Sequence, residues 1–200
     1  MKKQKAFTLV ELMVAMVMAL ILASWAVPNV RSLLLNNKIT TKTNGFIAAI
    51  NYARNEAITH SNSIIVIEPG VVQSGKLTFY NGNTPPDLPG DNEFGQGWRV
   101  WVDINNNQTA DDNDIIKIFD FKNDQIIFDA DQTALIHYIY QGRVRLPPDA
   151  TQLTFTICHK NYAQGRRVTI LATGRARTTR VDLDGDDGNY QCPPSGGGAA

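Results

Sequence analysis

The chain begins with a long apolar run. From Phe7 to Val27 the only strongly polar side chain is Glu11. About 20 apolar residues are what a helix needs to cross the hydrocarbon core of a membrane, so residues 7–28 predict a membrane-spanning helix. A carboxylate within such a span is costly unless it is paired. We therefore expect the Glu11 carboxylate to have a polar partner.

A helical repeat of apolar residues continues beyond Pro28, which is expected to kink the helix without ending it. The spacing predicts an amphipathic helix to about Thr59, whose apolar face packs on a sheet. The residues that carry the repeat are Leu35, Ile39, Phe46, Ile50, Ala53 and Ala57.

From Ser63 onward, short runs rich in β-branched and aromatic residues alternate with turn residues, a pattern that predicts strands. The runs are 64–67, 76–80, 98–102, 115–121, 125–128, 135–140, 153–157, 166–171 and 175–181. Turns are predicted at 81–82, 141–142 and 173–174, and a proline-containing loop at 84–90. We therefore expect one soluble α+β domain over residues 29–192, followed by a flexible tail, 193–200, that has nothing to bury.

Charge is unevenly distributed along a chain of 200 residues whose formal net charge is zero. Between Asp87 and Asp131 the balance is −8, and between Gln141 and Arg180 it is +7. Such asymmetry suggests an anion-binding face separate from an acidic one. Without the three lysines before Phe7 the chain carries 16 basic and 19 acidic residues, so net charge alone predicts no nucleic-acid partner.

The two cysteines, Cys158 and Cys192, predict a single disulfide. A chain whose start directs it across a membrane is expected to reach an oxidising compartment, where disulfides persist. The bond would close a loop of about 33 residues and stabilise the fold by about 3–4 kcal/mol in the chain-entropy model. Neither cysteine has a neighbouring CxxC pattern or paired histidines, so a metal or catalytic role is disfavoured.

The basic leader Lys2-Lys3-Gln4-Lys5-Ala6 runs directly into Phe7-Thr8-Leu9-Val10-Glu11-Leu12. That order resembles a type IV prepilin. The resemblance implies that residues 1–6 are a leader cut between Ala6 and Phe7 by prepilin peptidase, that Phe7 is N-methylated, and that Glu11 pairs with the Phe7 amine of a neighbouring subunit. It also implies a single-pass inner-membrane protein with a periplasmic domain, which reaches the cell surface once a pilus assembles. Ala6 departs from the family pattern, which usually has glycine before the cut.

Two alternatives explain the same apolar start. One is an ordinary secretory signal peptide cut after Ser24-Trp25-Ala26, and the other is a plain single-span anchor. N-terminal sequencing separates the three readings, because the mature chain would begin at Phe7, Val27 or Met1.

Later segments resemble, in the same order, the FimT/GspH family of minor pilins and pseudopilins. These segments are 45–58 with Ala53-Arg54-Asn55-Glu56-Ala57 at its centre, Gly97-Trp98-Arg99-Val100-Trp101-Val102-Asp103, Gln141-Gly142-Arg143, Phe155-Thr156-Ile157-Cys158, and Gly174-Arg175-Ala176-Arg177. Membership implies a type IV pilin-like fold, with one long N-terminal helix packed on small antiparallel β-sheets. It also implies other pilin subunits as partners.

The Gly174-Arg175-Ala176-Arg177 segment is the sharpest candidate binding site. On an extended strand, side chains two positions apart share a face about 6.6 Å apart, so Arg175 and Arg177 would present two guanidinium groups to a polyanion. The resemblance to FimT, the member this chain looks most like, implies sequence-independent DNA binding through this motif. Charged residues also guard strand edges against aggregation, which is the structural alternative. Further basic candidates are Arg143, Arg145, Lys160, Arg166, Arg167 and Arg180.

An acidic stretch, 103–114, is a candidate calcium loop with oxygen ligands in the order expected for such loops. Those residues are Asp103, Asn105, Asn107, Asp111 and Asp114. Gln108 replaces the glycine of the sharp turn and Asp114 replaces the longer glutamate, so a polar hairpin loop explains the stretch equally well. A second acidic patch comprises Asp182, Asp184, Asp186 and Asp187.

No catalytic constellation appears in the sequence. His60, His137 and His159 lack metal-ligand spacing, and no nucleophile elbow or phosphate-binding glycine loop is present. We therefore expect a protein that is not an enzyme and needs no cofactor. The resemblance implies a minor type IV pilin that binds DNA during natural transformation. The alternatives are a GspH-type pseudopilin of a type II secretion system with a purely structural role, and a calcium-stabilised adhesin-like subunit.

Overall fold

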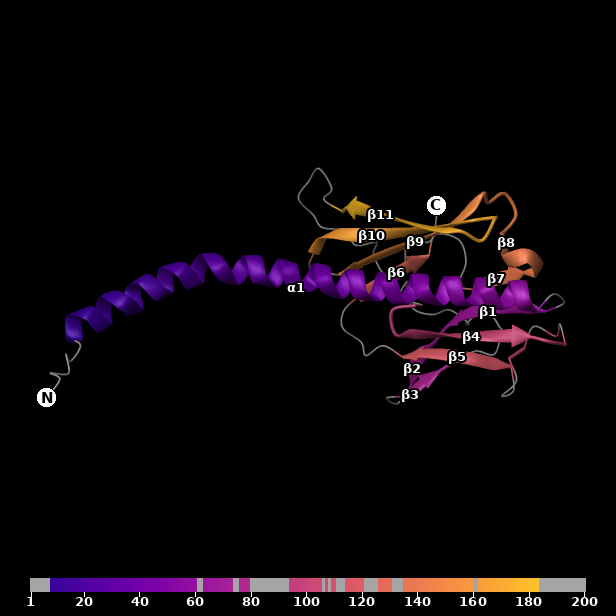
Figure 1. Cartoon of the computed structure of the whole chain (residues 1–200), viewed down its shortest axis with the longest axis horizontal. Coiled ribbons are helices and arrows are strands. Elements are labelled where there is room, and N and C mark those ends of the chain that lie inside the picture. The colour runs from indigo at the N-terminus through magenta and orange to yellow at the C-terminus, as the bar shows by residue number, and fades with distance from the viewer. Residues whose placement is uncertain are drawn as a thin grey trace, which may run out of the picture. The chain divides into compact units, whose positions relative to one another are not determined.

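The structure, a computed structural model, describes residues 8–60, 63–73, 76–79, 94–105, 107, 109–110, 114–120, 126–130, 135–159 and 162–183, without the side chains of 25–29 and of a few strand residues. One long helix, α1, runs from Leu9 to Thr59 (Figure 1). The chain forms two compact units, residues 1–37 and 38–200.

In the first unit the described side chains of α1 are exposed through Leu34. Large apolar residues are prominent among them, for example Leu9 at 75% and Leu22 at 72% exposure. Within the described residues, no helix is long and apolar enough to cross a membrane. The membrane-spanning role expected for residues 7–28 is therefore not confirmed and stays a prediction.

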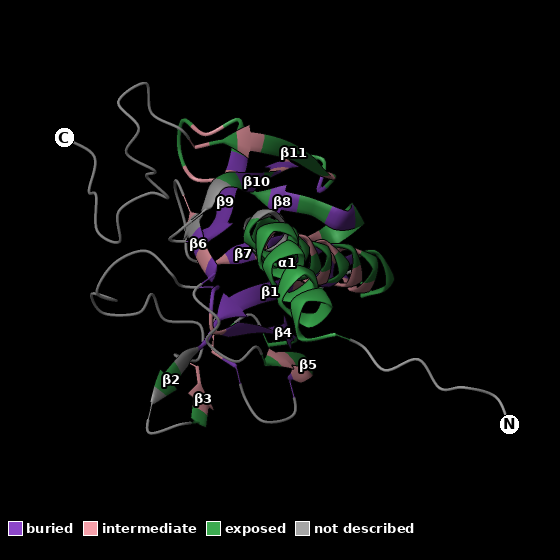
Figure 2. Ribbon diagram, turned by 90° about the vertical axis from the view of Figure 1, so that its left-hand side faces the viewer, coloured by how far each residue is buried: buried purple, intermediate pink, exposed green. Residues whose placement is uncertain are grey.

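In the second unit α1 buries one face against the strands (Figure 2). Ile39, Phe46, Ile50, Ala53 and Ala57 are all at most 1% exposed. Their spacing places them on one side of the helix, so the predicted amphipathic half and its end at Thr59 are confirmed.

The larger sheet has five strands in the order β5-β4-β1-β7-β8. Its central pair is β1 (Ile64–Pro69) and β4 (Gly97–Asp103), in which Glu68 lies opposite Arg99. β5 (Ile115–Asp120), β7 (Ile136–Ile139) and β8 (Arg143–Arg145) complete it, and a short 3-10 turn at Tyr140–Gly142 links the last two strands. Arg99 donates from Nε at 2.9 Å and Nη2 at 2.8 Å to Glu68 Oε2, so both buried charges are paired.

The second sheet has four strands in the order β11-β10-β9-β6. They are β6 (Ile126–Ala130), β9 (Gln152–His159), β10 (Tyr162–Leu171) and β11 (Ala176–Asp182). A separate hairpin pairs β2 (Val71–Gln73) with β3 (Lys76–Thr78). Every strand pair among the described residues is antiparallel, so the predicted pilin-like α+β architecture is confirmed.

Phe46 joins both sheets to the helix. Its ring lies 5.3 Å from that of Trp98 on β4, 5.6 Å from that of Phe128 on β6 and 5.1 Å from that of Phe155 on β9. All three contacts are edge-on or T-shaped, the arrangement that the quadrupoles of aromatic rings favour. The main core cluster is therefore shared by α1 and both sheets, and a second, smaller cluster comprises Val66, Trp101 and Ala110.

All nine predicted strands exist, with bounds that differ by a few residues. The prediction missed two strands of three residues each, β2 and β8. It also extended the 135–140 strand into Tyr140, which belongs to the 3-10 turn. The turn predicted at 81–82, the loop at 84–90 and the tail at 193–200 lie outside the described residues.

Candidate functional site

The tip of the β10–β11 hairpin is the three-residue loop Ala172–Gly174. Gly174 N donates to Leu171 O at 2.8 Å, and Leu171 N donates to Arg175 O at 3.0 Å. Gly174 has φ 76°, the left-handed conformation that ends this type of hairpin loop and suits glycine. The predicted turn at 173–174 is thus confirmed, and it places Arg175 just before the first residue of β11.

This loop touches the turn between β7 and β8, on the other sheet (Figure 1). Val144 N donates to Ala172 O at 3.1 Å. A Cβ atom built on Gly174 would lie 1.9 Å from Gly142 O, which leaves no room for any side chain. Gly142 itself has φ 68°. Two of the three glycine–arginine pairs of the sequence, Gly142-Arg143 and Gly174-Arg175, therefore meet in space.

Two further side chains reach this contact, which we call the glycine junction: Gly142 and Gly174 together with Arg54 and Tyr138. Arg54, on α1, donates from Nε to Gly142 O at 3.4 Å, and Tyr138, on β7, donates its hydroxyl to Gly174 O at 3.3 Å. Burial raises the pKa of Tyr138 above its ordinary 10, and the cationic Arg54 opposes the shift. The phenol is therefore a protonated donor at any physiological pH.

The strand register shows which arginines share a face. On β9 and β10 the core-facing residues include Phe155 and Val168, which pair with each other. Arg177 pairs with Thr169, and Arg167 pairs with Thr179, so both arginines belong to the opposite, outer face. As diagonal neighbours they are about 7–8 Å apart. Both are exposed.

Around these two arginines the outer face carries threonines, and one acid, Asp129 on β6, lies opposite Thr156 in the same cross-strand row as Arg167. Thr169 pairs with Thr154 on β9, and Arg167 pairs with Thr156. Hydroxyl groups can donate hydrogen bonds to anionic oxygens. Thr154 and Thr169 are partly exposed, so this face offers two threonine donors beside the guanidinium groups, whereas Thr156 is buried.

The other basic candidates differ in their surroundings. Arg143 and Arg145 are exposed on either side of the buried Val144, so they share a face as their spacing predicts. Arg166 is 8% exposed and donates to Thr40 Oγ1 on α1 at 3.3 Å and to Gly165 O at 3.4 Å, which is a structural position. Arg180 lies opposite Arg166, on the helix side of β11. Lys160 lies outside the described residues.

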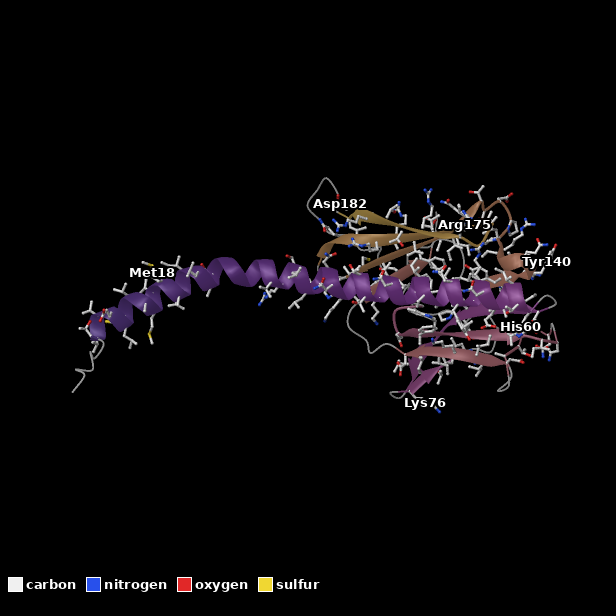
Figure 3. All side chains as sticks on the ribbon, in the orientation of Figure 1. Met18, His60, Lys76, Tyr140, Arg175 and Asp182 are labelled. Carbon is white, nitrogen blue, oxygen red and sulfur yellow. The ribbon has the colours of Figure 1, made fainter. Side chains whose placement is uncertain are left out.

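Besides Arg180 on the helix side of β11, five exposed arginines occur on β8, β10, β11 and the hairpin tip (Figure 3, where Arg175 is labelled). We call them the arginine cluster: Arg143, Arg145, Arg167, Arg175 and Arg177. None of them forms an ion pair with a carboxylate within the part of the chain that the structure describes. The acid at the far end of β11, Asp182, pairs in register with Gln164. The cluster is therefore open to an external anion.

The acidic stretch forms the loop between β4 and β5, which pair antiparallel, so the hairpin interpretation is confirmed. Its side chains cap their own backbone. Asn107 N donates to Asp103 Oδ1 at 3.0 Å and to Asn105 Oδ1 at 3.1 Å. Among the described residues, no group of three acids, histidines or cysteines is arranged to hold a metal. Asp111 and the acids 184, 186 and 187 lie outside those residues.

Glu11 has a partner that the sequence argument overlooked. Its carboxylate accepts from Thr8 N at 3.1 Å and from Thr8 Oγ1 at 3.2 Å, while Glu11 N donates to Thr8 Oγ1 at 3.2 Å. This reciprocal pair is a capping box, and its sequence signature, threonine followed three residues later by glutamate, was present. Ala6 and Phe7 lie outside the described residues.

Cys158 is fully buried on β9, whereas Cys192 lies outside the described residues. The disulfide therefore stays a prediction. The histidines lie in three different parts of the fold: His60 directly follows α1, His137 is on β7 and His159 is on β9.

A long N-terminal helix packed on antiparallel sheets defines the class as the type IV pilin fold, and comparison with solved structures supports this. A crystal structure of the type IV minor pilin FimU from Pseudomonas aeruginosa strain PAO1 is 17% identical, with a TM-score of 0.50 over 72% of this chain and 90% of FimU. A second crystal form gives 17% identity and a TM-score of 0.48 over 70% of this chain and 91% of FimU. No curated protein sequence matches.

Two sequence families also match. The prokaryotic N-terminal methylation motif matches residues 1–27, and the family described as type II transport protein GspH matches residues 42–174. The chain therefore belongs to the GspH family, as a GspH/FimT-like minor pilin. The GspH match ends at Gly174, so it includes the glycine junction and Arg143 but stops just before Arg175.

Proposed function

We propose that this protein is a minor type IV pilin that binds DNA during uptake through the arginine cluster. The observation that carries the proposal is the contact between Gly142 and Gly174, which brings two separate arginine pairs to one corner of the domain. Five exposed guanidinium groups without carboxylate partners among the described residues suit a polyanion.

The proposed contacts are with phosphates rather than bases. Arginine and threonine side chains on a sheet face can donate to phosphate oxygens, and such contacts carry no direct sequence information. No base-reading motif is apparent in the sequence. Binding should therefore be independent of sequence and weaken steeply with salt, because each neutralised phosphate releases condensed counterions.

The test is a salt titration with the full chain in a nonionic detergent and a labelled DNA duplex. If all five arginines contact phosphates, the slope of log affinity against log salt should be about −4.5. The double variant Arg175→Ala/Arg177→Ala should reduce the magnitude of that slope by about 2. Lys76→Ala/Lys117→Ala removes the same charge from β3 and β5 and should leave the slope unchanged.

A purely structural role as a GspH-type pseudopilin of a type II secretion system is the second candidate, favoured by the description of the matching family. It predicts no measurable duplex binding at low salt by the wild-type chain. It also predicts that the gene lies beside secretion genes rather than pilus or competence genes. Equal binding by wild type and the arginine double variant would remove the proposed site.

We further propose that the chain is cut before Phe7, N-methylated there, and held in the inner membrane with its domain in the periplasm until it joins other pilin subunits. The methylation motif at residues 1–27 supports this. A mature N-terminus at Phe7 is the expected sequencing result, and a start at Val27 would contradict it. In the same compartment Cys158 and Cys192 should form a disulfide, detected as one linked peptide under non-reducing conditions.

A further inference from the structure

We infer that Tyr138 and Arg54 are positioning residues: they hold the two arginine-bearing turns together so that the arginine cluster is ordered before DNA arrives. The inference rests on the proposed function and extends it to two residues that do not themselves belong to the binding surface. Its basis is the glycine junction, where three elements distant in sequence meet.

Tyr138 holds the hairpin tip from the side of the five-stranded sheet. It is fully buried, and its hydroxyl donates to Gly174 O at 3.3 Å. Gly174 directly precedes Arg175, so this hydrogen bond fixes the peptide unit from which the first arginine of the motif projects. Tyr138 Cε1 would also lie 3.1 Å from a Cβ atom on Gly174, so the ring itself packs against the turn.

Arg54 holds the other arginine-bearing turn, the one between β7 and β8. Its Nε donates to Gly142 O, and Gly142 directly precedes Arg143. A Cβ atom on Gly142 would lie 2.9 Å from Arg54 Cγ, so the aliphatic part of the side chain packs on the turn as well. The Gly142 carbonyl thus lies between the Arg54 guanidinium and Gly174. Each arginine-bearing turn is held by one side chain from a different element.

Pre-ordering matters because binding otherwise has to immobilise the groups that make the contacts. Ordering a long side chain costs about 0.5–1.5 kcal/mol, a factor of about 2–12 in affinity. Arg143 and Arg175 each follow a glycine with positive φ, whose backbone is permissive. If Tyr138 or Arg54 lost its hydrogen bond, these turns would sample more conformations, although the number of positive charges would stay the same.

The decisive variants are Tyr138→Phe, which removes one hydroxyl, and Arg54→Lys, which keeps the charge but loses the guanidinium donor. We expect each to weaken duplex binding about fivefold to tenfold while the salt slope stays that of wild type, because no phosphate contact is lost. Removal of Arg175 should instead lower the magnitude of the slope. Affinity and slope together separate positioning from direct contact.

Two controls separate positioning from general destabilisation. Tyr140→Phe removes the hydroxyl of an exposed tyrosine in the same β7–β8 turn as Gly142, and Ile126→Val weakens the core on β6. Both should bind DNA as wild type does. Amide exchange gives a readout without DNA: the Val144 amide, which donates to Ala172 O, should exchange faster in Tyr138→Phe than in Ile126→Val.

The outcomes are distinct. Wild-type affinity in both decisive variants, with binding still lost on removal of Arg175 and Arg177, would overturn the positioning role and leave the proposed function standing. No duplex binding by the wild-type chain would overturn both. Weaker binding with an unchanged slope, together with faster Val144 exchange, supports the inference.

Discussion

Replacing Phe46 by alanine should be the most damaging single core substitution on α1. The side chain is fully buried and lies within 5.1–5.6 Å, centroid to centroid, of four aromatic rings. A buried phenylalanine removes about 150–250 Å² from water, worth about 4–6 kcal/mol at 25 cal/mol per Å². Measured Phe→Ala losses in cores are about 3–5 kcal/mol, and we expect a value in that range.

The assay is urea unfolding of the full chain in nonionic detergent, followed by tryptophan fluorescence, since Trp98 packs directly on Phe46. Phe119→Ala is the matched control, because that ring stacks on Trp98 but is only partly buried. The free energy of unfolding lost in Phe119→Ala should be about half of that lost in Phe46→Ala. A Phe46→Ala loss below about 1.5 kcal/mol, well under the usual range, would refute the conclusion that one shared core holds α1 to both sheets.

Three other perturbations test separate features. Gly174→Ala forces an alanine into the left-handed conformation, which costs about 1–2 kcal/mol, and pushes its methyl group against the carbonyl oxygen of Gly142. The melting temperature and the affinity for duplex DNA should therefore both fall. An unchanged affinity would contradict the geometry of the glycine junction. Glu68→Gln leaves a buried arginine without its carboxylate and should cost about 3–5 kcal/mol in urea unfolding; a loss within error would contradict the pairing. Burial lowers the pKa of His137 below its ordinary 6.5, so the free energy of unfolding should fall as the pH drops below about 6.5, by at most about 1.4 kcal/mol per pH unit. His137→Asn should flatten that dependence, and His60→Asn, at an exposed site, should not.

The packed half of α1 was predictable because burial on a helix repeats every three to four residues. Ile39, Phe46 and Ile50 carry that period in the sequence and lie in the core. β8 was not predictable in the same way. It has one buried residue, Val144, between two exposed arginines, and three residues are too few to establish a period of two.

The sequence predicted which arginines could form the candidate site, but not which of them come together in the fold. Arg166 and Arg167 are adjacent in the sequence, yet one is buried against Thr40 and the other is exposed beside Arg177. Which of the two faces outward depends on the register of β10 with β9 and β11. That register follows an irregularity between Tyr162 and Arg166, and local residue types do not determine it. The contact between Gly142 and Gly174 is likewise not predicted by any local sequence pattern.

The acidic region, residues 87–131, and the basic region, residues 141–180, also differ in how far the fold exposes their charged side chains. Two acids of the β4–β5 hairpin, Asp103 and Asp114, are only 1% and 6% exposed, and Asp103 accepts a hydrogen bond from the backbone of its own loop. The arginines of the basic region face solvent, apart from Arg166. The structure therefore buries these two acids at the loop end of the hairpin, whereas Asp120 at the end of β5 and most of the arginines are exposed. For a phosphate approaching the glycine junction, the relevant charge is that of the arginine cluster rather than the formal net charge of zero, since screening limits the reach of distant acids to about 10 Å at moderate salt.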